Sequence, residues 1–142
     1  IRFMQTMIND LERIADIYYQ ISKLAEKMTE SRASWPDDAA GEMEQMLKVV
    51  HDAIVTMKHN TALSPEDVTL DRAIECENAI DRTRDAFRDN HYARLESGNY
   101  PARAGVTFMD MLNRLERIGD HIMNVNESAA GKRLKAMRID ED

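Results

Sequence analysis

A fifteen-residue amphipathic segment occurs twice in this chain, once near each end. Residues 7–21 read MINDLERIADIYYQI and residues 111–125 read MLNRLERIGDHIMNV, with seven identities in an ungapped alignment. Apolar residues recur at spacings of three and four in both copies, which is typical of a helix that buries one face. The repeat therefore predicts two equivalent helices that organise the fold.

The rest of the chain also favours helix, because glycine and proline are scarce and good helix formers are abundant. No segment alternates polar and apolar residues in the manner of a strand. The periodicity predicts four long helices, at residues 1–29, 38–60, 64–97 and 101–130. Four helices of similar length joined by short loops predict an all-α fold, an antiparallel up-down four-helix bundle.

Boundary signals support this division. Ser64-Pro65-Glu66-Asp67 is typical of a helix start, and Gly131 of a helix end. We expect a helical domain over residues 1–131 and a charged, frayed tail over residues 132–142. The sequence starts at Ile1 already in helical register, so we interpret it as part of a longer polypeptide.

In the first predicted helix, the expected core-facing stripe contains Met4, Met7, Ile8, Leu11, Ile14, Ala15, Tyr18, Ile21 and Ala25. Ala15 and its repeat equivalent Gly119 are small enough to allow close helix approach. Trp35 lies in the first loop, where we expect it to cap one end of the bundle. Cys76 is the single cysteine, so no disulfide forms within the chain, which fits a reducing compartment.

Charge and hydropathy exclude several classes of protein. The formal net charge of −7 argues against nucleic acid as a partner. No run of 18 apolar residues is present, so no transmembrane helix is predicted in this sequence, and no signal peptide is recognised.

Paired acids recur on three of the predicted helices, four residues apart each time. The pairs are Glu12 and Asp16, Glu77 and Asp81, and Glu116 and Asp120. This spacing puts two carboxylates on one helix face, within reach of one cation. Oxygen ligands suit iron, zinc, manganese or magnesium.

We expect Glu77 near the centre of an apolar stripe, where a buried acid needs a partner. Arginines near in sequence, such as Arg84, offer the alternative of ion pairs. Among the histidines, His121 directly follows Asp120 and is the best candidate for a supporting role.

These residues resemble a known family. Leu115-Glu116-Arg117-Ile118-Gly119-Asp120-His121, followed by Asn124 and Glu127, resembles the signature helix of the PhoU domain, and Leu11-Glu12-Arg13-Ile14-Ala15-Asp16 its first-repeat copy. Ala73-Ile74-Glu75-Cys76-Glu77-Asn78-Ala79-Ile80-Asp81 is similar to the family's other acidic helix, and the resemblance covers about residues 4–130. Residues 7–22 most resemble the C-terminal cytoplasmic region of bacterial sodium/phosphate cotransporters.

The resemblance implies a non-catalytic, regulatory domain in inorganic phosphate uptake, on the cytoplasmic side of the inner membrane. Its partner would be a transmembrane transporter domain, in the same polypeptide if the cotransporter likeness holds. It also implies acidic motifs that bind metal ions. A full family member has two three-helix repeats, each with an acidic helix before its signature helix. The one before Glu12 lies outside this sequence, so only Glu77, Asp81, Glu116 and Asp120 form a complete set.

Other hypotheses remain beside this one. A stand-alone PhoU-type regulator and a plain helical interaction module both fit the same residues. A ferritin-like di-iron enzyme does not, because that site needs Glu-x-x-His and no histidine here has a Glu three residues before it. An apolar face left without its neighbouring helix would favour a homodimer or a swapped assembly.

Overall fold

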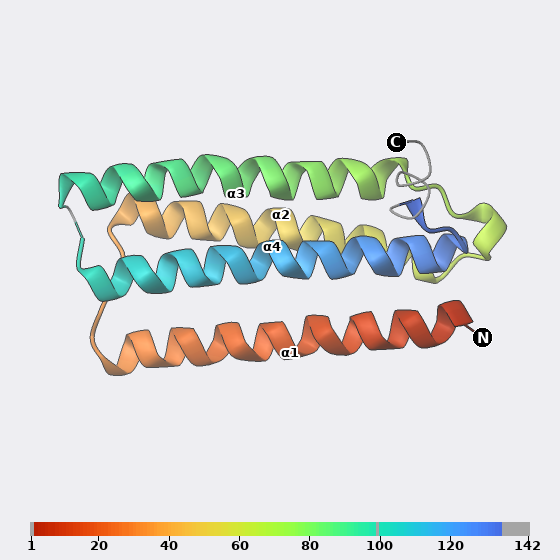
Figure 1. Ribbon diagram of the computed structural model, residues 1–142, viewed down its shortest axis with the longest axis horizontal. Helices are drawn as coiled ribbons and strands as arrows, with labels where there is room; N and C mark the ends of the chain where they lie inside the picture. The colour runs from red at the N-terminus through yellow and green to blue at the C-terminus, as the bar shows by residue number, and fades with distance from the viewer. Residues whose placement is uncertain (1, 99, 135–142) are drawn as a thin grey trace.

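The computed structural model describes residues 2–98 and 100–134, and this part of the chain contains no strand. Its four long helices are α1 (Arg2–Glu30), α2 (Asp37–Thr61), α3 (Asp71–Ser97) and α4 (Ala102–Ala130), with a short 3₁₀ helix, η1 (Pro65–Asp67), before α3. Successive helices run in opposite directions (Figure 1). The predicted all-α fold, an antiparallel up-down four-helix bundle, is therefore confirmed.

The helix α4 lies at the centre of the arrangement. It packs against all three of the other long helices, while α2 and α3 also pack against each other. Figure 1 shows α1 on the opposite side of α4 from α3. Within this four-helix bundle, α2, α3 and α4 thus pack closely together and α1 lies along the outer side of α4.

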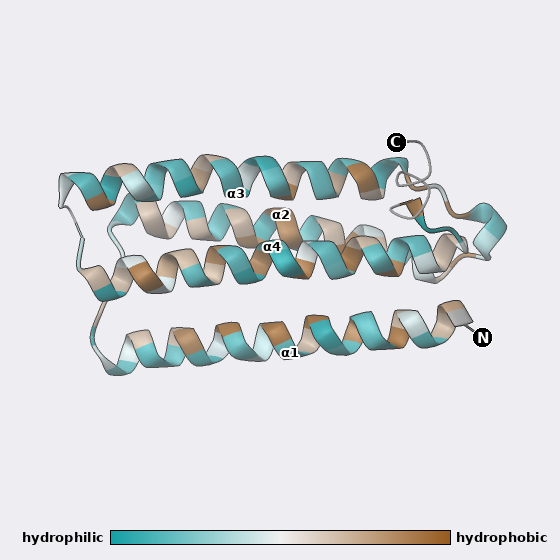
Figure 2. Cartoon of the chain, in the orientation of Figure 1, coloured by the Kyte–Doolittle hydropathy of each residue, from teal (hydrophilic) through white to brown (hydrophobic). Residues whose placement is uncertain are grey.

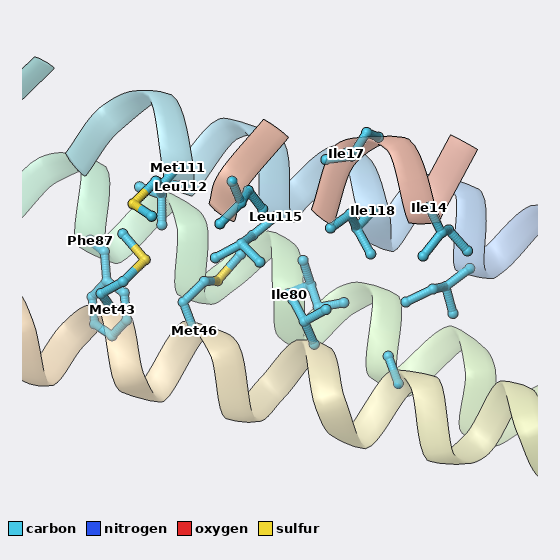
Figure 3. Close-up of a cluster of buried hydrophobic side chains, with 14 of the residues drawn as sticks. Ile14, Ile17, Met43, Met46, Ile80, Phe87, Met111, Leu112, Leu115 and Ile118 are labelled. Atoms are coloured by element: carbon cyan, nitrogen blue, oxygen red, sulfur yellow. The ribbon is translucent and has the colours of Figure 1, made fainter. Parts of the chain in front are cut away.

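The core follows the inner faces of these helices. Leu112, Leu115 and Ile118 of α4 are completely buried, and Met46 of α2 and Ile80 of α3 pack into the same cluster (Figure 3). Most of the surface of α3 is hydrophilic (Figure 2), so this helix contributes only a narrow apolar line. Figure 3 also shows Ile14 and Ile17 reaching the cluster from α1.

Only part of the stripe predicted for α1 is buried. Ile14 and Ile21 are buried as expected, but Ile8 and Leu11 are exposed. Ile17, which lay outside the predicted stripe, is buried. The predicted orientation is therefore wrong for half the stripe, because α1 packs along one neighbour and a single helix covers only a narrow strip.

The third long helix starts later than its sequence signal suggests. Pro65–Asp67 form η1, and the chain then extends through Val68 before α3 begins at Asp71. Val68 is buried against Ala129 and Ala130 at the end of α4. An extended residue at this point lets the chain close the end of the bundle, and this contact overrides the local preference for a continuous helix.

Two predicted helix ends are confirmed. Gly98 and Gly131 follow α3 and α4 in left-handed conformations, with φ of 69° and 67°. This geometry favours glycine, which carries no Cβ. Within the predicted tail, residues 135–142 lie outside the described residues, so the domain boundary at residue 131 remains a prediction.

Trp35 caps the end of the bundle where α4 begins, as predicted. Its indole N–H donates a hydrogen bond to the carbonyl of Ala104 (2.8 Å), and its ring meets the edge of Phe108. Tyr100 closes the same end against Gly105, where an added Cβ would lie 2.6 Å from the Tyr100 ring.

We therefore expect Gly105→Ala to lower the free energy of unfolding by roughly 1–3 kcal/mol, because the buried Tyr100 ring has to move. Gly41→Ala is the matched control. Gly41 lies in α2 with no atom within 4 Å of an added Cβ, so alanine there should stabilise the helix by up to about 1 kcal/mol. Urea unfolding of both variants measures the difference, and equal effects would contradict this account.

Candidate functional site

The six predicted acids fall into two groups. Glu77 and Asp81 lie on α3 and Glu116 and Asp120 on α4, two helices that pack together. All four are partly buried. Glu12 and Asp16 lie on α1 and are exposed.

Glu116 lies at the centre of the first group. Its carboxylate forms an ion pair with Arg84 of α3, with 3.1 Å between Arg84 Nη1 and Glu116 Oε1. Both side chains are 21% exposed, and Arg84 also pairs with Asp85 at 2.8 Å. Of the two interpretations of these acids, ion pairing with arginine describes Glu116.

Burial raises the pKa of Glu116, and the neighbouring charge of Asp120 raises it further. Arg84 opposes this rise, and Asp81 adds to it from across the helix interface. Three carboxylates therefore act on one another here, with Arg84 as the positive charge among them. The single positive charge of Arg84 does not balance three carboxylates. A proton or a cation that binds here therefore relieves the repulsion among the three carboxylates.

Glu77 is not at the centre of the buried face of α3, contrary to the prediction. The buried positions of this helix are Ala73, Cys76, Ile80, Phe87, His91 and Arg94. Glu77 lies one residue to the side of this line and is half-buried. The predicted position was wrong because the expected stripe included Ile74 and Leu95, which are not buried, and omitted Cys76, which is buried.

The positions of these acids can be compared with what a metal ion needs, which is several ligand side chains around one point. Across residues 2–98 and 100–134, no three His, Cys, Asp or Glu side chains are grouped so that they could hold one metal ion. Glu116 meets the Arg84 guanidinium in this arrangement. The described side chains do not form a preassembled metal centre, and the six-residue metal assignment remains a prediction.

A further polar contact joins the two repeat helices. Asp10 of α1 is buried, and it accepts hydrogen bonds from His121 Nδ1 (2.8 Å) and Asn124 Nδ2 (3.3 Å) of α4. On the other side of the same interface, Arg114 of α4 donates to Gln20 of α1. His121 thus supports the α1–α4 contact rather than its neighbour Asp120.

These two contacts are related by the internal repeat. Asp10 aligns with Arg114, and Gln20 aligns with Asn124, so exchanging the helices turns one contact into the other. The repeat helices therefore pack as an antiparallel pair with approximate two-fold symmetry. Asp10 was missed in the sequence, although its spacing from Ile14 and Ile17 places it on the buried face.

No helix in the described part of the chain combines the length and apolar character needed to cross a lipid bilayer.

The helices that carry these contacts also match a known protein family. The family model of the PhoU domain matches residues 38–129, which span α2, α3 and nearly all of α4. The chain belongs to the PhoU domain family.

A curated relative extends the match. The phosphate-specific transport system accessory protein PhoU homolog 1 of Thermotoga maritima is 29% identical over 147 aligned residues, which cover 95% of this chain and 60% of that protein. This PhoU domain chain thus spans less than two thirds of the relative's length. No solved structure matches it significantly.

The PhoU domain also buries a charged cluster at the end that Trp35 caps. Arg94 is 8% exposed and donates two hydrogen bonds to Glu42 of α2, at 3.1 and 2.7 Å. His91 stacks on Phe108, with ring centroids 5.6 Å apart, and shares a hydrogen bond with Tyr100. Cations and aromatic rings together replace apolar packing at this end.

Protonation of His91 should destabilise this cluster. Burial lowers the pKa of His91 and the nearby charge of Arg94 lowers it further, while Glu42 partly opposes both. The folded state therefore takes up the proton less readily than the unfolded chain, in which the pKa is near its ordinary value of 6.5. Stability that is present above this value is lost as the pH falls below it.

We expect the melting temperature of the PhoU domain to fall between about pH 7.5 and pH 5.5, and His91→Gln to reduce this fall. Glutamine can keep a hydrogen bond to Tyr100 without taking up a proton. His59→Gln, at an exposed position of α2, is the control and should leave the pH dependence unchanged. Identical slopes for His91→Gln and the parent chain would contradict this role of His91.

Proposed function

We propose that this chain is a non-catalytic regulatory domain of inorganic phosphate transport, of the stand-alone PhoU accessory type. The PhoU family match over α2–α4 carries this proposal. The T. maritima relative supports it, since its name assigns it to a phosphate-specific transport system and the alignment covers almost all of this chain. A transporter is then the partner, reached from the cytoplasmic side of the membrane.

A fused arrangement is the second candidate. Residues 7–22 resemble the C-terminal region of sodium/phosphate cotransporters, in which the transporter domain lies in the same polypeptide. The accessory-type relative favours the stand-alone form. Membrane-spanning segments in the coding sequence before residue 1 would decide for the fused form.

The function is tested by phosphate uptake in the source cells. We expect deletion of residues 1–142 from the gene to change the rate of radiolabelled phosphate uptake and to weaken its response to external phosphate. Restoring the coding sequence should restore both. Uptake of an unrelated anion, such as sulfate, is the control for general damage to the membrane. Unchanged phosphate uptake at both low and high external phosphate would refute the proposal.

The metal hypothesis has its own support and its own test. The electrostatic potential around Glu116 is made more negative by the nearby carboxylates of Asp81 and Asp120. A divalent cation bound there would offset this negative charge. Arg84 already supplies positive charge there, so it should compete with a bound cation.

We therefore expect the chain purified without chelator to contain metal, and the double variant Glu116→Ala/Asp120→Ala to contain less. The control is Glu44→Ala/Asp52→Ala, which changes two exposed acids of α2 and should keep the metal content of the parent chain. Arg84→Gln should tighten binding of manganese or zinc, because the competing charge is removed. Absence of metal from all four proteins, with no gain in melting temperature on adding iron, zinc, manganese or magnesium, would leave these acids as ion-pairing groups.

A further inference from the structure

A pocket lies between the end of α1 and the start of α4. Its volume is about 550 Å³, which is within the range of pockets that hold small organic ligands. Figure 1 shows these two helix ends side by side, and α1 and α4 pack against each other. The lining residues come from both helices and from the turn after α1. A ligand held here would therefore contact both repeat helices.

Positive charge exceeds negative charge in this pocket, although the net charge of the chain is −7. Its charged lining residues are Lys27, Arg103 and Glu30. Lys27 lies in the last turn of α1 and Arg103 in the first turn of α4. Neither cation forms an ion pair or a hydrogen bond with any residue that the structure describes. Both are therefore available to an anion that enters the pocket.

The backbone favours an anion at the same place. No described side chain caps the start of α4, where the N-cap residue is Pro101, and no acid lies in the first turn. The N–H groups of that turn therefore add a partial positive charge. At the end of α1, the N–H groups of Ser31, Arg32 and Ala33 bond to carbonyls of the last turn, which weakens the opposite partial charge there.

The uncharged lining residues add a donor, an acceptor and an apolar wall. The Thr107 hydroxyl makes no hydrogen bond with any described residue, so it can donate to a ligand. Ser31 Oγ already donates to the carbonyl of Met28 at 3.0 Å, so toward the pocket it accepts, as Glu30 does. Leu24 and Met28 are half-buried and form the apolar wall. A matching ligand has an anion, hydroxyl groups and an apolar body.

We propose that this pocket binds a nucleoside monophosphate. Such a phosphate monoester carries nearly two negative charges at neutral pH and three acceptor oxygens. Its phosphate meets the two cations and Thr107, its ribose hydroxyls donate to Glu30 and Ser31, and its base lies on the apolar wall. Arginine is well suited to this role because its planar guanidinium can hold two phosphate oxygens at once.

Other sources of phosphate satisfy the pocket less completely. Inorganic phosphate uses only the donors, leaves the apolar wall uncovered and meets the carboxylate of Glu30 without a hydroxyl between them. A phospholipid headgroup lies in a membrane surface that is itself anionic, so a chain with a net charge of −7 is repelled from it.

The internal repeat offers a comparison within the same molecule. The approximate two-fold relation pairs the pocket with the groove between the start of α1 and the end of α4. There the guanidinium of Arg133 lies over the ring of Phe3, 5.8 Å from its centroid, and donates a hydrogen bond to Thr6. Phe3 is the repeat equivalent of Thr107. The chain thus supplies its own cation at one end of the helix pair, whereas the other end carries cations around a pocket.

Binding is tested by isothermal titration calorimetry of the chain with AMP, GMP, CMP and UMP. At least one of the four should bind. The corresponding nucleoside and inorganic phosphate should each bind at least about tenfold more weakly, because each meets only part of the pocket. Lys27→Met/Arg103→Met should weaken nucleotide binding by at least about tenfold, since charge-assisted hydrogen bonds are lost.

Two further variants sharpen the result. Lys48→Met/Lys58→Met removes two exposed cations of α2 and is the matched control, which should bind nucleotide as the parent chain does. Thr107→Val keeps the shape of the side chain without its hydroxyl and should weaken binding severalfold. The melting temperatures of the charge variants without ligand should equal that of the parent chain, because the changed side chains are exposed.

Several results would overturn the proposal. One is no binding of any of the four nucleotides at concentrations up to about 10 mM, where even millimolar affinity is visible. Another is unchanged affinity in Lys27→Met/Arg103→Met, and a third is equal affinity for inorganic phosphate or the nucleoside. Binding to phosphatidylglycerol vesicles, lost in the double variant and without any nucleotide binding, would identify a lipid headgroup instead. These readings are independent of any effect on phosphate uptake.

Discussion

Burial of α4 on two opposite sides is the constraint on which the rest of this structure depends. The α2–α3 hairpin covers one side, and α1 lies along the other. Such a helix needs apolar residues over a wide arc. Leu112, Leu115 and Ile118 meet this requirement with complete burial, and Gly119 allows Ile80 to approach closely. The same requirement leaves α1 incompletely covered, since it carries a related pattern with a single neighbour.

The polar residues of this domain are used mainly to join helices. Asp10 joins α1 to α4, Glu116 is joined by Arg84 to α3, and Arg94 joins α3 to Glu42 of α2. Each contact lies at the border of the apolar core, where a partly buried hydrogen bond or ion pair fixes the rotation of one helix on another.

Sequence periodicity was sufficient to predict four helices, their order and most of their ends. It succeeded because glycine at Gly98 and Gly131 and the three- and four-residue spacing are local signals. It failed where burial depends on neighbours. Leu11 and Leu115 are equivalent in sequence, yet only Leu115 is covered, and nothing local distinguishes them. The late start of α3 also escaped prediction, because Val68 is held by Ala129 and Ala130 at the far end of the chain.

The candidate site was predicted in part. The acid pairs on α3 and α4 do lie on packed helices, but the role of Arg84 depends on its distance across the interface, which sequence spacing does not give. Arg94 was not recognised as an interior residue, because a search for apolar stripes passes over a charged side chain whose partner, Glu42, comes from another helix. The resemblance of the signature helix to the family was recognised from its repeated polar residues, since a buried helix face needs only apolar residues at the right spacing.

The attachment of α1 by one side has a consequence for how the molecule opens. Proteins lose structure in cooperative units, and a unit held by fewer contacts opens at a lower free energy than the whole. The helices α2, α3 and α4 bury residues against one another, such as Met46 and Ile80, whereas Ile14 and Ile17 of α1 add to this cluster near Ile118 (Figure 3). Within the described residues, we therefore expect α1 to open at a lower free energy than the rest of the fold, and its release would expose one side of α4.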